Sequence, residues 1–352
     1  MSFLSYQVSY RWIILCCCVL AYAVSFLVRW SYTGLAPYIS DDLSLDKGAL
    51  GLLGAAFFYP YALAQIPWGW LTDRVGGRFV IGCGVLFSAV GLACFATSVS
   101  VWDAIAWRMV LGLVAATDFV PIASLLAQWF SAQERGLANG LYYGLGGGLG
   151  QGAAFFLMPF LTVYVLNDSV FPISGWRGAL VVVALILGIL GVICLIFLRS
   201  YPSGLNGKLF LDDIQPISCS KQPEKERTRS LQAFYDPAFW LLAALFSASL
   251  IALRLVPAWI SLYASDVLSL RWDYERDAAI IAGGVMGILY TIGHVFGSPL
   301  LGKLSDWLLS IGGQRLLLPT VCLGFGAFIV TFFLFTIPPP WLLGLVSLLL
   351  GI

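Results

Sequence analysis

Long apolar windows recur along the whole chain and constrain its fold more than any other feature. Nine of them can cross a bilayer, because a helix of about 20 apolar residues spans the roughly 30 Å hydrocarbon core. They cover residues 12–36, 48–71, 79–100, 104–130, 136–161, 178–199, 237–264, 278–303 and 315–337. A tenth window begins at Trp341 and runs to Ile352, so we expect these residues to be part of a longer protein. The pattern predicts an all-α membrane protein.

The composition excludes several functions. Hydrophobic residues make up 60% of the chain and charged residues 11%, against about 25% charged residues in a soluble domain. The net charge of +1 predicts no nucleic-acid partner. The eight cysteines lack metal-ligand spacing, and the sequence contains neither an ATP-binding loop nor a catalytic constellation. We therefore expect no metal, no cofactor and no enzymatic activity.

Basic residues are distributed unevenly between the windows. With the N-terminus in the cytoplasm, twelve lysines and arginines fall inside and four outside, while Arg29, Arg108 and Arg254 lie within windows. Because cytoplasmic loops carry the excess of positive charge, we expect an integral multi-pass protein with a cytoplasmic N-terminus. In a bacterium it would lie in the inner membrane.

One long polar stretch, residues 200–235, separates the sixth window from the seventh. It contains the charged run "SKQPEKERTRS", which is typical of a solvated loop on the positive side of the membrane. The sequence therefore predicts a six-helix bundle over residues 1–199 and a cytoplasmic linker over 200–235. A second bundle follows over 236–352, with helices 7–9 and part of helix 10.

The two halves contain related segments. Three residues of "GWLTDRVGGR" (69–78) recur in "GKLSDWLLSIGGQR" (302–315) at a constant offset of 233. The matched pairs are Gly69 and Gly302, Leu71 and Leu304, and Asp73 and Asp306. Arg29 also has a counterpart, Arg254, at an offset of 225. Such repeats are typical of secondary transporters, which bind substrate between the halves near the middle of the membrane.

The motifs resemble those of the major facilitator superfamily. The loop 2–3 signature Gly-x-Leu-x-Asp-Arg-x-Gly, the pattern Arg-x-x-x-Gly in helix 4 and the segment "WFSAQERGLANG" before helix 5 carry the resemblance. The matching residues are Gly69, Leu71, Asp73, Arg74 and Gly76 for the first, and Arg108 and Gly112 for the second. The resemblance implies the major facilitator fold, with twelve helices in two bundles and the second bundle truncated here.

The resemblance also implies a set of conformational gating residues. Asp73, and Asp306 as its mirror, would brace the interface by lying near the positive end of another helix. Gly69, Arg74 and Gly302 complete the set. The alternative is that these are ordinary interfacial charges, with Arg74 an anchor on the cytoplasmic side.

Arg29 and Arg254 require an explanation, because a charge at the centre of a bilayer costs roughly 2.5–3.5 kcal/mol. Arg29 could pair with an acid elsewhere in the bundle, such as Asp118. Alternatively, it faces the central cavity and binds an anion, since a guanidinium holds carboxylate or phosphate with two parallel hydrogen bonds. The presence of arginines at equivalent positions of both halves favours the second interpretation.

This arginine pair narrows the resemblance to the organophosphate:phosphate antiporter and anion:cation symporter branches. In the first branch both arginines would hold a phosphate. The sequence has Gln65 in place of that branch's lysine and Tyr143 in place of its histidine. We therefore include Arg29, Arg254, Gln65 and Tyr143 as substrate-binding candidates and expect an organic anion.

Two further residues are candidates for proton coupling. Asp118, an isolated acid inside a window, could become protonated near neutral pH in a low-dielectric environment; it could equally be a fixed counter-ion to Arg29 or Arg108. His294 is the only histidine and could carry a proton or form a packing hydrogen bond. The glycine-rich segment 144–152 is interpreted as a close helix contact, because small residues let membrane helices approach each other.

These observations predict a monomeric secondary transporter that moves a small organic anion, a carboxylate or phosphate ester, by alternating access. Transport would be coupled to protons or to exchange with another anion. The partners are the anionic substrate and the lipid bilayer. The alternative is a transporter-like membrane receptor that binds the same anion without moving it.

Overall fold

The computed structural model describes residues 2–131, 134–165, 175–200, 237, 239–240, 257–259, 262–310 and 339–351, and all of its regular elements in these ranges are helical. The labelled elements, in chain order, are α1 (Ser2–Asp42), α2 (Lys47–Val75), α3 (Gly77–Ala96), α4 (Val101–Ala115), α5 (Phe119–Trp129), α6 (Arg135–Leu141), η1 (Tyr142–Gly146), α7 (Gly147–Phe160), η2 (Leu161–Val165), α8 (Gly175–Phe197), α11 (Arg276–Ser310) and α13 (Pro340–Gly351). Residues 262–272 are also helical.

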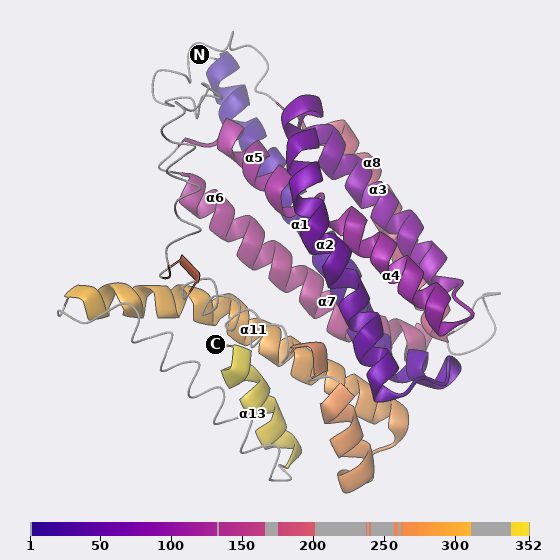
Figure 1. Ribbon diagram of the computed structural model, residues 1–352. Helices are drawn as coiled ribbons and strands as arrows, with labels where there is room; N and C mark the ends of the chain where they lie inside the picture. The colour runs from indigo at the N-terminus through magenta and orange to yellow at the C-terminus, as the bar shows by residue number, and fades with distance from the viewer. Residues whose placement is uncertain are drawn as a thin grey trace.

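Six apolar stretches long enough to span a membrane form the first bundle (Figure 1). They are Tyr10–Asp42, Lys47–Val75, Gly77–Ala96, Val101–Trp129, Arg135–Tyr164 and Gly175–Phe197, and each overlaps one of the first six apolar windows. Arg276–Gly293, within α11, is a further stretch of this kind. The windows 237–264 and 315–337 lie largely or wholly outside the described residues, as does the predicted linker.

Two of the predicted spans are interrupted. The fourth breaks at residues 116–118, where α4 ends and α5 begins. The fifth contains π-helical turns at η1 and η2. Apolar length alone does not show such breaks, because hydrophobic residues continue through both of them.

Small residues set how closely the first bundle packs. α1 packs against α7, α2 against α4, and α3 against α8. A Cβ atom on Gly146 would lie 2.8 Å from the Val19 carbonyl oxygen, and one on Gly150 would overlap the Ala23 carbonyl group. Gly144 and Gly152 have nothing within 4 Å of such an atom. Part of the glycine-rich segment therefore makes a close helix contact, as the sequence predicted, and its partner is α1.

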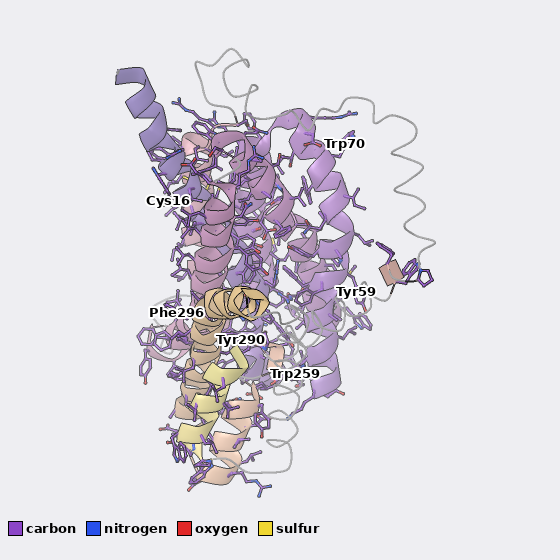
Figure 2. All side chains as sticks on the ribbon, turned by 90° about the vertical axis from the view of Figure 1, so that its left-hand side faces the viewer. Cys16, Tyr59, Trp70, Trp259, Tyr290 and Phe296 are labelled. Atoms are coloured by element: carbon purple, nitrogen blue, oxygen red, sulfur yellow. The ribbon has the colours of Figure 1, made fainter. Side chains whose placement is uncertain are left out.

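The outer face of α2 carries large apolar side chains. Tyr59, Leu63, Ile66 and Trp70 are each more than half exposed, and Figure 2 shows Tyr59 and Trp70 on the outer side of this helix. A soluble monomer rarely exposes such a continuous apolar surface. This face is suited to lipid or to another apolar helix.

The second half lies beside α7 (Figure 1). α11 packs against α7 and α13. The contact with α7 is close, because a Cβ atom on Gly287 would lie 2.6 Å from the ring of Phe155. Small residues thus bring the two halves together as well as the helices within one half.

Candidate functional site

Arg29 lies in the interior of the first bundle, with 3% of its surface exposed. It projects from α1 into a group of aromatic rings. Its guanidinium carbon is 4.4 Å from the ring centroid of Tyr61, 4.7 Å from that of Phe26 and 5.7 Å from that of Phe57. Aromatic faces attract a cation, so these rings compensate part of the cost of burying the charge.

Asp118 is the acid nearest to this guanidinium. The Asp118 Oδ2 atom lies 4.0 Å from Arg29 Nη2, beyond hydrogen-bond distance, and both side chains are buried. Asp118 occupies the break between α4 and α5, where its Oδ1 accepts a 2.5 Å hydrogen bond from the Phe119 N–H. The structure therefore brings two of the predicted site residues together as a loose, buried ion pair.

Several polar atoms at this pair and beside it lack hydrogen-bond partners. Within the described part of the chain, Arg29 Nε, Arg29 Nη2 and Asp118 Oδ2 form no hydrogen bond, and neither does Trp30 Nε1. These atoms are also covered by their neighbours. Buried polar groups are normally hydrogen-bonded, and an unsatisfied one is often functional. The three nitrogen atoms could donate to an anion.

Arg108 differs from Arg29 although both are buried. Its guanidinium donates to the backbone carbonyl oxygens of Leu53 at 3.3 Å, Val28 at 3.4 Å and Arg29 at 3.4 Å. These bonds connect α4 to α1 and α2. Arg108 was not predicted as a site residue, although its charge within an apolar window was a signal. Its guanidinium donors are bound to backbone carbonyl oxygens, which indicates a structural role.

A cavity of about 410 Å³ lies beside both arginines, between α1, α2 and α4 of the first half and Ala258, Trp259 and Leu262 of the second. Its lining is mostly apolar and aromatic and includes Arg29, Arg108, Trp30, Tyr32, Phe58 and Trp259. This volume falls within the usual range for small-molecule sites. The location between the two repeated halves is the one expected for a secondary transporter.

The other substrate-binding candidates lie elsewhere or are not described. Gln65 on α2 is partly buried and does not line this cavity. Tyr143, in η1, places its ring 5.7 Å from Tyr22 and 6.4 Å from Phe119, and it also does not line the cavity. Arg254 and the side chain of His294 lie outside the described residues.

The predicted gating residues of the first half lie near the C-terminal end of α2. Arg74 stacks on Trp70 at 3.8 Å, Asp73 is exposed, and a Cβ atom on Gly69 would lie 3.3 Å from Val120. Gly76, at a φ of +91°, forms the turn to α3, so the last glycine of the motif has a conformation that other residues rarely adopt. Gly302 and Asp306 lie on α11, with side chains outside the described set.

A metal centre has no support in the described ranges, where no three His, Cys, Asp or Glu residues form a group that could hold an ion.

The helical bundles, the repeat and the cavity define a class of protein, the polytopic membrane proteins built from two related halves. The sequence matches the model of the Major Facilitator Superfamily over residues 18–352. The chain belongs to this superfamily and is an integral, multi-pass membrane protein with the all-helical fold of that family.

Curated relatives are transport proteins rather than enzymes. A "probable hexose phosphate transport protein" of Chlamydia pneumoniae is 25% identical over 312 residues, covering 82% of this chain and 62% of the relative. A "probable galactarate/D-glucarate transporter" of Bacillus subtilis is 28% identical over 192 residues, covering 50% and 40%. The chain therefore spans less than two thirds of the length of these relatives.

Solved structures show the same fold. A bacterial homologue of the human lysosomal transporter Spinster, in an inward-facing conformation, has a TM-score of 0.68 at 21% identity. The match covers 97% of this chain and 73% of that one. A D-xylose–proton symporter has a TM-score of 0.59 at 15% identity, covering 97% and 79%.

Proposed function

We propose that the protein is a secondary transporter that moves a small organic anion, a carboxylate or phosphate ester, across the membrane by alternating access. The observation that carries this proposal is Arg29, a residue that lines the cavity between the halves and whose buried guanidinium has donors without hydrogen-bond partners in the described part of the chain. Arg254, its repeat counterpart, would bind the anion from the other half. Relatives named as probable transporters of hexose phosphate and of galactarate or D-glucarate, which are anions, support this class.

The contact between Arg29 and Asp118 supplies a route to proton coupling. A substrate anion and the Asp118 carboxylate would compete for one guanidinium, since they have the same charge and Asp118 is only 4.0 Å away. Protonation of Asp118 removes its charge and leaves Arg29 free for substrate. Lower pH would therefore favour anion binding, and proton and anion would move in the same direction. Exchange of one anion for another is the alternative coupling mode.

The gating residues have a separate role in this proposal. Asp73 and Asp306 would stabilise the interface between the halves without touching substrate, each near the positive end of a helix. Gln65 and Tyr143 would contribute to the substrate site only in another conformation, because neither lines the cavity here. The protein would act as a monomer with its N-terminus in the cytoplasm.

Thermal stabilisation by candidate ligands tests the substrate class. The purified protein should be stabilised by members of a panel of carboxylates and phosphate esters and not by matched uncharged analogues. Arg29→Gln should lose this stabilisation while its melting temperature without ligand stays close to that of the wild type. Stabilisation that is equal for the uncharged analogues, or that survives in Arg29→Gln, would contradict the proposal.

A further inference from the structure

A second internal repeat lies at the end of the bundle farthest from the N-terminus. Residues 38–45 read "YISDDLSL" and residues 263–270 read "YASDVLSL", so six of eight positions are identical at an offset of 225. This offset is the one that relates Arg29 to Arg254. The local structure repeats too, because the Ser40 hydroxyl donates to the Pro37 carbonyl oxygen and the Ser265 hydroxyl donates to that of Leu262.

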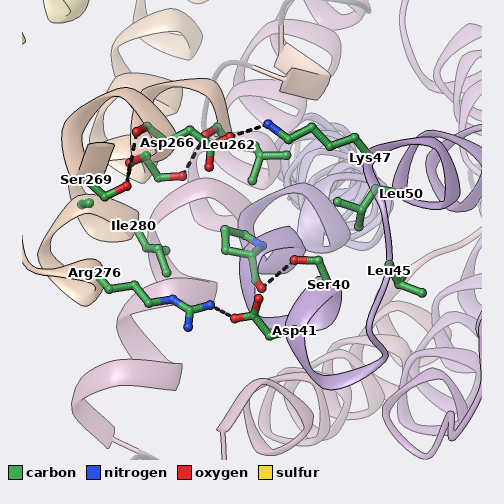
Figure 3. A pocket seen from close by; sticks show the side chains of 13 residues that line it. Ser40, Asp41, Leu45, Lys47, Leu50, Leu262, Asp266, Ser269, Arg276 and Ile280 are labelled. Carbon is green, nitrogen blue, oxygen red and sulfur yellow. Dashed lines mark hydrogen bonds and ion pairs between the residues drawn. The ribbon is translucent and has the colours of Figure 1, made fainter. Parts of the chain in front are cut away.

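The aspartate of each repeat forms an ion pair with the opposite half (Figure 3). Asp41, at the end of α1, pairs with Arg276. Asp266 pairs with Lys47, with a distance of 2.7 Å between Oδ2 and Nζ. Lys47 is the first residue of α2 and Arg276 the first residue of α11. Each carboxylate therefore contacts the start of the helix that follows the other repeat.

We infer that these two ion pairs, Asp41–Arg276 and Lys47–Asp266, form a two-fold-related latch that holds the halves together at this end of the central cavity. A smaller pocket of about 190 Å³ lies at the latch, and Leu50 and Leu262 line both this pocket and the cavity beside Arg29. The latch thus lies between this end of the molecule and the cavity that Arg29 lines. The Tyr38 hydroxyl, which donates to Asp277 Oδ1 at 3.1 Å, adds a further polar contact between the halves at this end.

The reciprocal arrangement explains how the latch can open and close as a unit. Both pairs join the same end of the first half to the same end of the second half. Separation of the halves at this end therefore breaks both pairs together. Their side chains are 37–75% exposed, and exposed ion pairs are weak and screened by salt. The latch would therefore bias the equilibrium between closed and open states without locking it.

The neighbouring residue Asp42 provides a matched control. Its carboxylate contacts Trp176 Nε1 at 3.1 Å and pairs with Arg177, and both partners belong to the first half. Asp41 and Asp42 are adjacent exposed acids, yet one joins the two halves and the other does not. Replacing them separately distinguishes loss of the latch from loss of an ordinary surface ion pair.

Distance measurements between spin labels test the inference without any substrate. Labels would be attached to Gly48→Cys and Leu270→Cys, one on each side of the latch, in a protein whose eight cysteines are replaced and which is held in lipid nanodiscs. Asp41→Asn and Asp266→Asn should each lower the ratio of short to long distances by about two- to five-fold, as expected for exposed ion pairs. Asp42→Asn should leave the ratio unchanged.

A charge exchange checks that pairing itself is responsible. Lys47→Asp combined with Asp266→Lys should restore the population with short label distances, which either substitution alone reduces.

Salt provides a second check. At about 1 M salt the screening length is about 3 Å. The ratio of short to long label distances should then fall in the unsubstituted labelled protein but not in Asp41→Asn/Asp266→Asn. An unchanged ratio in both asparagine variants, or an equal change in Asp42→Asn, would overturn the inference. Because no carboxylate or phosphate ester is added, neither result depends on the proposed substrate.

Discussion

Two buried arginines, Arg29 and Arg108, differ in whether their guanidinium donors have hydrogen-bond acceptors. Arg108 donates to three backbone carbonyl oxygens, so its charge is used in joining helices. Arg29 keeps Nε and Nη2 without acceptors in the described part of the chain and lies against aromatic rings and Asp118. We therefore expect substitutions of the first to affect stability and substitutions of the second to affect binding.

Arg29→Lys should weaken anion binding by roughly 10- to 100-fold, because lysine keeps the charge but loses the two-pronged geometry of a charged hydrogen-bonded pair. Arg108→Leu should instead lower the free energy of unfolding by about 2–4 kcal/mol, since it leaves buried carbonyl oxygens without donors. Equilibrium binding and thermal unfolding of both variants measure the two effects. Near wild-type affinity in Arg29→Lys would remove this arginine from the site.

Asp118→Asn should bind the anion at least as tightly as the wild type at neutral pH and should lose the pH dependence of binding. The reason is that asparagine carries no charge to compete for Arg29 at any pH. In the wild type, affinity should rise as pH falls, because the protonated form of Asp118 leaves Arg29 available. Affinity measured between pH 5 and 8 checks both statements, and an unaltered pH profile in Asp118→Asn would assign the coupling proton elsewhere.

The helices show which parts of the structure could be predicted from sequence. Apolar length was sufficient to predict six spans in the first bundle, because the bilayer requires that length. The break at residues 116–118 could not be predicted in this way, because apolar length does not show that Asp118 caps α5. The sequence predicted Arg29 as a site residue from its charge, but the cavity position of Trp30 depends on how α1 is rotated against α2 and α4.

Gly150→Ala should lower thermal stability, and Gly152→Ala should not. Both residues lie in α7, but a methyl group at position 150 would overlap the backbone of Ala23 in α1, whereas position 152 is open. Overpacking of this kind typically costs about 1–3 kcal/mol, while alanine favours a helix over glycine by roughly 1 kcal/mol. Thermal unfolding in the same detergent compares the two, and equal melting temperatures would contradict the close α1–α7 contact.

The molecule consists of two related halves. The cavity and the ion pairs between the halves lie at different distances from the N-terminal end. The cavity beside Arg29 lies between the halves, and the two ion pairs of the latch lie between it and the end farthest from the N-terminus. Sequence repeats place arginines at equivalent positions and acids at equivalent helix ends. Alternating access therefore requires that binding at the cavity and separation at the latch occur in one cycle.

Counterflow in proteoliposomes tests that account most directly. Liposomes containing the protein and loaded with an unlabelled anion from the stabilising panel should accumulate the same anion, radiolabelled, from outside without any imposed gradient of protons. Arg29→Gln should abolish this accumulation, while Asp42→Asn should retain it. Saturable binding of the labelled anion by the wild type without accumulation would contradict transport and would instead identify the protein as a membrane receptor for that anion.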